Sequence, residues 1–144
     1  MDNTELAYLA GFFDGEGCIR IICVKDRGYL YGNHRLWIQL TNTNQEIMDK
    51  IRNLGWYVRE IKKLKKHWKR CWVGVLKDNK ALEFLQSVFP FLTVKRDEAK
   101  LAIEFQLRKL EMKNKKGRNG NGFMEFEYRE SIKKQLSELK EQKI

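Results

Sequence analysis

The opening of the chain is apolar on nearly every side of a predicted helix. Large residues share one face at helical spacing, namely Leu6, Leu9 and Phe13, and small ones share another, namely Ala7, Ala10 and Gly11. A helix that is apolar all round must be buried all round, and its small-residue face would let a second helix approach closely. Two glycines, at 15 and 17, end this helix after Asp14 and leave Glu16 at its C-terminus.

Alternating apolar and polar residues predict two β-hairpins. The first joins Cys18–Lys25 to His34–Asn42 through a turn-like stretch. On its second strand Leu36, Ile38 and Leu40 are predicted to face the core, and Arg35, Trp37 and Gln39 to face outward. The second hairpin joins Tyr57–Leu64 to Cys71–Leu76 around a basic turn at 65–70. Because lysine occupies both faces of this hairpin, the sequence leaves its register open.

Helical spacing of apolar residues predicts the remaining elements. Asn44 is expected to cap a helix that stops at Gly55, and Asn79 to cap another that ends at Pro90. An amphipathic helix over Ala99–Leu110 is predicted to break at the glycine- and asparagine-rich run Lys113–Gly122, before a last helix over about Glu125–Gln142. The predicted order is α-β-β-α-β-β-α with further C-terminal helix, an α+β protein.

Composition indicates a single domain with a polyanionic partner. The 144 residues are 42% hydrophobic, which suffices for one core, and the net charge of +10 favours nucleic acid. We expect one domain over 1–144, with its core at about 5–111 and a C-terminal extension at 112–144. No stretch of about 18 uncharged apolar residues and no leader is found, so we expect a soluble protein that has no membrane partner.

The cysteines indicate a reducing environment. Three of them, Cys18, Cys23 and Cys71, form no CxxC pair and leave no complete set of disulfides. Adding His34 and His67 gives a conceivable zinc set, but the spacings match no zinc-finger pattern, so structural zinc is not predicted. We expect an intracellular, reducing location, either cytoplasmic or organellar (chloroplast or mitochondrion).

The segment Leu9–Gly17 reads LAGFFDGEG and closely resembles the motif that names the LAGLIDADG homing endonucleases. Pro90–Lys95, PFLTVK, resembles a PFL-x-x-K segment of the single-motif members. The resemblance covers about Leu6–Leu110, most of the chain. It implies the αββαββα fold with a saddle-shaped, four-stranded antiparallel sheet. It also implies a homodimeric DNA endonuclease that cuts a long pseudo-palindromic site in double-stranded DNA, encoded within an intron in many members.

The chemistry of the motif agrees with this resemblance. If the small-residue face of Ala7, Ala10 and Gly11 packs against its own copy, two Glu16 carboxylates meet and form a site for divalent cations. Phosphodiester cleavage benefits from metal ions about 4 Å apart. We therefore expect Mg²⁺, with Mn²⁺ able to substitute and Ca²⁺ binding without cleavage. The Gly15 carbonyl, at the negative end of the helix dipole, is a predicted second ligand.

The resemblance also assigns two further catalytic residues and a reading surface. Lys95 matches the family's active-site lysine, which stabilises negative charge. Asn42 lies where relatives often carry Gln, although its side chain is one methylene shorter, and an amide there would orient the attacking water. The strand residues expected to contact DNA are Arg20, Ile22, Val24, Arg35, Trp37, Gln39, Arg59, Ile61, Lys63, Arg70 and Trp72.

Several alternatives compete with this interpretation. The first helix could be an ordinary core helix that ends in a solvated carboxylate, and the basic runs could be plain solvated surface. Within the motif itself, Asp14 is expected to be a structural group at the helix end and not a metal ligand. Gly15-Glu16-Gly17 begins like a dinucleotide-binding GxGxxG, but Arg20 occupies the third glycine position and the glycines follow a helix, so that interpretation fails. No small-molecule substrate is expected. An alternative function on the same scaffold is a maturase or regulator that binds nucleic acid without cutting it.

Overall fold

The computed structural model describes residues 1–26, 29–116 and 122–142. In this part the order of elements is the predicted one, followed by two long C-terminal helices. The elements are α1 (Asn3–Glu16), β1 (Gly17–Val24), β2 (Asn33–Asn42), α2 (Gln45–Asn53), β3 (Tyr57–Glu60), β4 (Trp72–Lys77), α3 (Asp78–Val88), the 3-10 turn η1 (Phe89–Phe91), α4 (Arg96–Lys116) and α5 (Phe123–Glu141).

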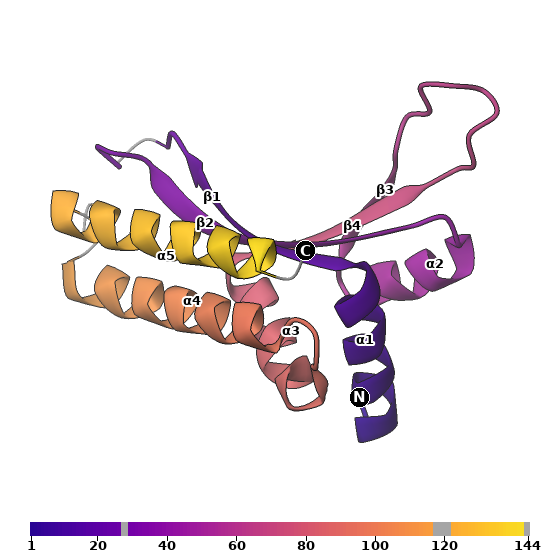
Figure 1. The fold of residues 1–144 in the computed structure, drawn as a ribbon, viewed down its shortest axis with the longest axis horizontal. Coiled ribbons are helices and arrows are strands. Elements are labelled where there is room, and N and C mark those ends of the chain that lie inside the picture. Colours follow the sequence, from indigo (N-terminus) through magenta and orange to yellow (C-terminus); the bar gives the residue numbers. More distant parts are fainter. Residues whose placement is uncertain (27–28, 117–121, 143–144) are drawn as a thin grey trace.

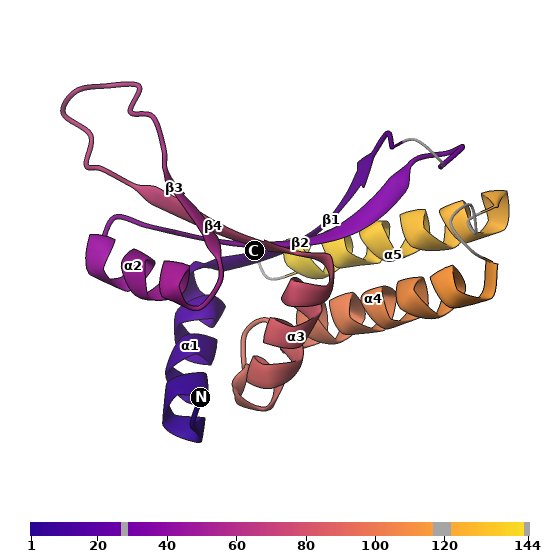
Figure 2. The same cartoon turned by 180° about the vertical axis from the view of Figure 1, so that it is seen from behind.

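The sheet is antiparallel and has the strand order β1-β2-β4-β3. The two hairpins rise toward opposite ends of the molecule, and the helices lie on the other side of the strands (Figure 1 and Figure 2). One face of the sheet is therefore covered by helices, while the opposite, concave face is left open. The α+β class and the saddle-shaped sheet are confirmed.

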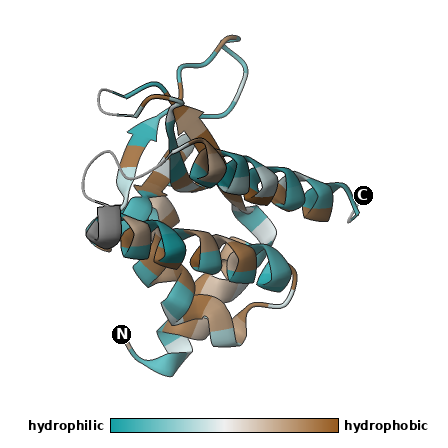
Figure 3. Cartoon of the chain, turned by 90° about the vertical axis from the view of Figure 1, so that its left-hand side faces the viewer, coloured by the Kyte–Doolittle hydropathy of each residue, from teal (hydrophilic) through white to brown (hydrophobic). Residues whose placement is uncertain are grey.

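The core lies between the sheet and the helices. Leu36, Ile38 and Leu40 on β2 are at most 1% exposed, as their alternation predicts, and they pack in one cluster with Leu9 and Phe13 of α1. Figure 3 shows hydrophilic residues along the outward faces of the long helices and hydrophobic residues between them and the sheet. Removing such side chains from water supplies about 25 cal/mol per Å² of apolar surface, so this cluster is the main stabilising contribution to the fold.

Helix starts agree with the predictions at one site and differ at another. The Asn44 side chain accepts from the Ile47 backbone N–H at 3.0 Å and caps α2. Asn79 is not a cap: α3 begins one residue earlier, at Asp78, after Lys77 in the cap position. The Asn79 Oδ1 instead accepts from the Gln106 side chain at 3.0 Å. The capping prediction for Asn79 was wrong because a tertiary contact from α4 uses its side chain.

The C-terminal extension packs on the rest of the chain. Ile132 and Leu136 of α5 belong to the same hydrophobic cluster as the sheet. Glu125, 5% exposed, pairs with Arg108 of α4 at 2.9 Å, and the Lys140 ammonium donates to the Ile19 carbonyl. The predicted break at 113–122 begins later than expected, since α4 continues to Lys116, and residues 117–121 lie outside the described part. Across the described helices, none is both long and apolar enough to cross a membrane.

One half-buried lysine supports the side of the first hairpin that the helices cover. Lys109 of α4 donates from Nζ to the His34 carbonyl at 2.6 Å. Burial lowers the pKa of Lys109 to about 8, and the nearby Asp78 carboxylate opposes that shift. The desolvation of this ammonium group costs free energy, and its hydrogen bond to the His34 carbonyl offsets part of that cost.

The turn from α1 into β1 requires a residue without a side chain. A Cβ at Gly17 would lie 2.4 Å from the Phe13 ring and 2.7 Å from the Phe13 carbonyl oxygen. Changing Gly17→Ala should lower the free energy of unfolding by about 1–3 kcal/mol, because the ring and the backbone must both give way. Urea denaturation followed by circular dichroism would measure this loss.

The contact with Phe13 can be isolated by a double-mutant cycle. Phe13→Leu alone should destabilise the protein, but adding Gly17→Ala to it should cost less than in the wild type, since the ring is gone. Strict additivity of the two losses would contradict the steric account.

Candidate active site and nucleic-acid interface

Helix α1 delivers a single carboxylate to its C-terminal end. Glu16 is the last helical residue, and it and Gly15 are exposed. Within the described residues the Glu16 carboxylate makes no ion pair or hydrogen bond. The last carbonyls of a helix lack intrahelical partners and carry the negative end of its dipole. This end therefore gathers oxygen ligands and negative charge, which suits a hard divalent cation.

Asp14 fixes the same helix end to the segment before α4. Its carboxylate accepts from the backbone N–H groups of Thr93 at 2.8 Å and Lys95 at 2.9 Å. In return the Lys95 ammonium donates to the Asp14 carbonyl at 2.7 Å. Asp14 is thus a structural group, as the sequence suggested, and its two oxygens are already used. The structure also brings Lys95 to the helix end that carries Glu16.

Asn42 lies at the end of β2, on the side of the sheet that the helices cover. Its Oδ1 accepts from the Asn44 backbone N–H at 2.8 Å, and its side chain borders a surface hollow with Tyr8 and Phe12 of α1. Since Gly17 pairs with Leu40, Asn42 is two residues beyond the start of β1. The amide is therefore beside α1, with its oxygen held in a local turn.

The open face of the first hairpin carries the predicted reading residues together. Arg20 is paired with Trp37 across the strands, and Ile22 with Arg35, so these four share one face. Gln39 and Val24 lie on this face by the same alternation. The Trp37 side chain is held by two neighbours on this face. Its indole N–H donates to the Gln39 side chain at 3.2 Å, and the Lys77 ammonium lies 4.6 Å from the centre of its ring.

Asp78 holds one of these residues in place. Its carboxylate pairs with the Arg35 guanidinium at 2.5 Å, and both side chains are 32% exposed. Asp78 itself has a φ of +53°, in the left-handed region that few residues other than glycine adopt. This backbone conformation lies at the junction of β4 and α3, directly below the open face.

The second hairpin corrects two predicted residues. Arg59 pairs with Val73 on the open face, whereas Trp72 pairs with Glu60 on the opposite face. Arg70 also belongs there, since it bonds Glu60 at 2.8 Å and stacks 5.1 Å from the Trp72 ring centre. Arg70 and Trp72 were therefore assigned to the wrong face. Alternation could not reveal this error, because every residue of β4 from Trp72 to Leu76 is buried and its apolar run shows no alternation.

The remaining residues of this hairpin extend the open face less regularly. β3 ends at Glu60 rather than Leu64. The Ile61 N–H still donates to the Cys71 carbonyl at 2.8 Å, so Ile61 continues the pairing. Lys63 lies beyond it, in the loop between the strands. The sequence analysis missed further residues that share the open face with Arg59 and Trp37, among them Tyr57, Val75 and Lys77.

The small-residue face of α1 is only partly free. Ala7 and Gly11 are exposed, beside Tyr8 at 59% exposure. Ala10 is fully buried in the core of its own chain, so its assignment to an interface between two chains was wrong. It lies one residue after Leu9 and three before Phe13, which places it on the inward face. A Cβ at Gly11 or Gly15 would meet no atom within 4 Å.

Comparisons with known proteins agree with this geometry. The family model described as LAGLIDADG endonuclease matches residues 9–95. The fold is similar to that of the archaeal intron-encoded homing endonuclease I-Vdi141I complexed with DNA, with a TM-score of 0.74 and 16% identity over 96% of this chain and 86% of that one. It is also similar to I-CvuI in complex with its target in the presence of 2 mM Ca, with a TM-score of 0.72 and 21% identity over 94% and 82%.

A third similar structure differs in its extent. LAGLIDADG homing endonuclease I-GzeII in complex with a DNA target has a TM-score of 0.67 and 16% identity over 89% of this chain, but over only 43% of its own. No curated protein sequence matches this chain as a relative.

The structural role of Asp14 can be tested against a matched carboxylate. Asp14→Asn should lower the free energy of unfolding by about 1–3 kcal/mol, because Thr93 and Lys95 donate to different carboxylate oxygens and asparagine replaces one of these acceptors with an NH2 donor. Glu16→Gln is the control: an exposed carboxylate without partners should change stability by less than about 0.5 kcal/mol. Equal losses in the two variants, measured by urea denaturation, would contradict the assigned role.

Proposed function

Because this chain belongs to the LAGLIDADG endonuclease family, we propose that it is a metal-dependent endonuclease that hydrolyses both strands of a long, nearly palindromic DNA site as a homodimer. The observation that carries this proposal is the exposed Glu16, which has no partner among the described residues, at the end of a helix that exposes the small residues Ala7 and Gly11. The net charge of +10 favours a polyanionic substrate.

A second copy of the chain supplies what one subunit lacks. Each subunit presents one Glu16 carboxylate, and a hard cation takes about six oxygen ligands. Ala7 and Gly11 leave room for a second α1 helix to approach closely. Within one subunit no atom occupies the space in which a Cβ at Gly11 would lie. Two α1 helices that pack there bring both C-terminal ends together, and the second carboxylate and the DNA phosphates complete the coordination.

The residues at this end divide the chemistry among them. Glu16 and the Gly15 carbonyl would hold the cation, which when bound would lower the pKa of a water and neutralise charge on the leaving oxygen. Lys95, fixed by Asp14, sits beside them as a positive charge for the phosphate in the transition state. The Asn42 oxygen is used by Asn44, so its amide nitrogen is the group that would orient the attacking water.

The open face of the sheet reads the DNA. Its concave shape between two raised hairpins fits a DNA duplex. The strands would then lie in the major groove of that duplex. Arginine and glutamine side chains there can pair with guanine and adenine edges, and Ile22 and Val24 can contact thymine methyl groups. Arg59 and Ile61 extend the reading surface on the second hairpin, and Lys63 in the loop beyond is suited to a phosphate.

Replacing Glu16 tests catalysis directly. On a cleavable site selected from a randomised DNA library with Mg²⁺ or Mn²⁺, Glu16→Gln should lose cleavage by at least about 10²-fold. DNA affinity in Ca²⁺ should stay within a few-fold of the wild type. Glu46→Gln, an exposed carboxylate on α2, is the control and should cut normally.

Two outcomes would overturn the enzymatic proposal. One is a wild-type chain that binds a site but cuts none with either metal, as a maturase or regulator on this scaffold would. The other is a cleavage rate that stays unchanged when the metal site is disabled, either by Glu16→Gln or by removal of divalent metal with a chelator.

Replacing Gly11 tests the assembly. The wild type should sediment at about twice the chain mass of 17.3 kDa. Gly11→Leu should sediment as a monomer with unchanged circular dichroism, because a Cβ at this exposed position meets nothing within 4 Å in the subunit, whereas the leucine fills the space that the second helix requires. Lys134→Leu, an equally exposed position on α5, is the control and should remain dimeric. A dimeric Gly11→Leu would place the interface elsewhere.

A further inference from the structure

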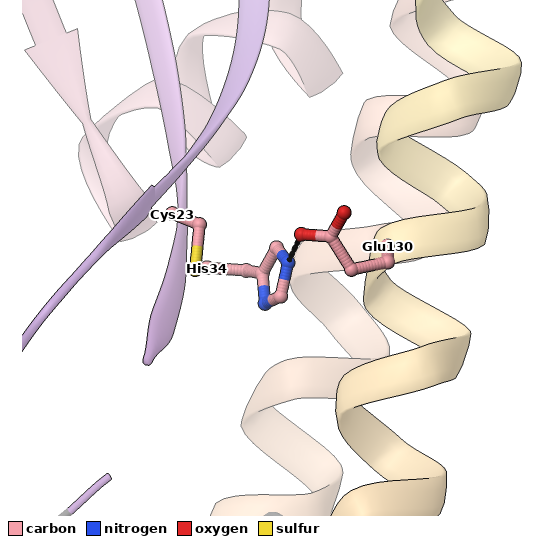
Figure 4. A group of neighbouring side chains, drawn as sticks. All are labelled: Cys23, His34 and Glu130. Carbon is pink, nitrogen blue, oxygen red and sulfur yellow. Dashed lines mark hydrogen bonds and ion pairs between the residues drawn. The ribbon is translucent and has the colours of Figure 1, made fainter. Parts of the chain in front are cut away.

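Three metal-ligating side chains meet where α5 crosses the first hairpin. Cys23 lies on β1, His34 is its direct partner on β2, and Glu130 extends from α5 (Figure 4). Their ligand atoms all lie within 4.8 Å of one another. We propose that these residues form a binding site for Zn²⁺, which fastens the C-terminal helix to the sheet. The site is separate from Glu16 and does not depend on the proposed cleavage activity.

The distances suit a tetrahedral ion after small side-chain movements. With metal to ligand distances of about 2.0–2.3 Å, tetrahedral ligands stand about 3.3–3.8 Å apart. The His34 Nε2 and a Glu130 oxygen are now 2.6 Å apart in a hydrogen bond, so an ion would have to separate them by about 1 Å. Cys23 is exposed and the Glu130 side chain is 42% exposed, so both can adjust around His34, which is fixed in the core.

His34 is prepared to act as a neutral ligand. Burial lowers the pKa of His34, which keeps the imidazole in the form that has a free lone pair, although the hydrogen bond to Glu130 opposes this shift. Its Nδ1 is buried without a hydrogen-bond partner among the described residues. In the metal-free chain the Glu130 carboxylate holds the ring proton on Nε2, so binding of a metal at Nε2 would move this proton to Nδ1.

The donor set selects zinc rather than the proposed catalytic cation. Thiolate and imidazole prefer Zn²⁺, whereas Mg²⁺ requires oxygen ligands and octahedral geometry. A thiolate and a carboxylate together balance the charge of a divalent ion, which offsets the repulsion from Lys133 one turn along α5. Three protein ligands at a partly exposed position leave the fourth for water.

The ion would act on the attachment of α5. Apart from this cluster, α5 contacts the sheet through Ile132 and Leu136 in the core, through the Phe126 ring 5.2 Å from the His34 ring, and through Lys140 at its far end. A metal at Glu130 adds a link between two strands and a helix that are about 100 residues apart in sequence. Because only the folded chain brings the three ligands together, binding stabilises the folded state.

Cobalt substitution tests the site on the full chain without DNA. After chelator treatment under reducing conditions, one Co²⁺ per chain should produce a near-ultraviolet band of thiolate to metal charge transfer, and excess Mg²⁺ should leave this band unchanged. One equivalent of Zn²⁺ should displace the cobalt and raise the melting temperature by several degrees. No such band in the wild-type chain would overturn the proposal.

Matched variants identify the ligands. Cys23→Ser should lose the band, while Cys71→Ser, at a cysteine on the other hairpin, should keep it. Glu130→Gln should bind Zn²⁺ at least tenfold more weakly in calorimetry, and Glu16→Gln should bind it as tightly as the wild type. A band that persists in Cys23→Ser or disappears in Cys71→Ser, or unchanged zinc affinity in Glu130→Gln, would show that this cluster is not the site.

Discussion

The positions of Glu16 and Lys95, two of the proposed catalytic groups, depend on the hydrogen bonds of Asp14. One carboxylate takes two backbone N–H groups from the segment after η1, and the lysine of that segment returns a bond to the carbonyl of Asp14. These bonds join residues 79 to 81 positions apart in sequence. They fix the end of α1 against the rest of the chain, so Glu16 and Lys95 are arranged before any ligand arrives. Such preorganisation is what electrostatic catalysis requires.

The sequence predicted the fold well where patterns were local. The alternation on β2 put Leu36 and Ile38 inside and Trp37 outside, as found, and the Asn44 cap was correct. On β4 the strand is apolar on both faces, so no periodicity distinguished Trp72 from Val73, and the register of the second hairpin came only from its pairing with β3. The orientation of this central strand is not visible in the sequence because its residues on the open face, Val73 and Val75, are apolar and nearly as little exposed as those that face the helices.

The errors and omissions at the sites have the same origin in long-range contacts. Ala10 has the size expected for a helix interface, but only the position of the core shows that it faces inward. Asn79 resembles a cap until Gln106 of α4 takes its side chain. Cys23, His34 and Glu130 match no zinc motif, since two strands and a distant helix bring them together. Spacing rules detect ligands that lie close along the chain, and they cannot detect this arrangement.

The two proposed metal sites make opposite demands on the protein. The site at Glu16 is incomplete in one chain, because a single carboxylate and a helix-end carbonyl fall short of the ligands that a hard cation needs. An exposed, unpaired Glu16 carboxylate costs little free energy because water solvates it. When two α1 helices meet, however, the two carboxylates repel each other. Assembly is therefore linked to the binding of the metal, which offsets this repulsion, and of the DNA phosphates. The cluster at His34 has its three ligands in one chain. Its occupancy therefore follows folding alone and is insensitive to assembly, so this chain would use one ion for chemistry and another for the attachment of α5.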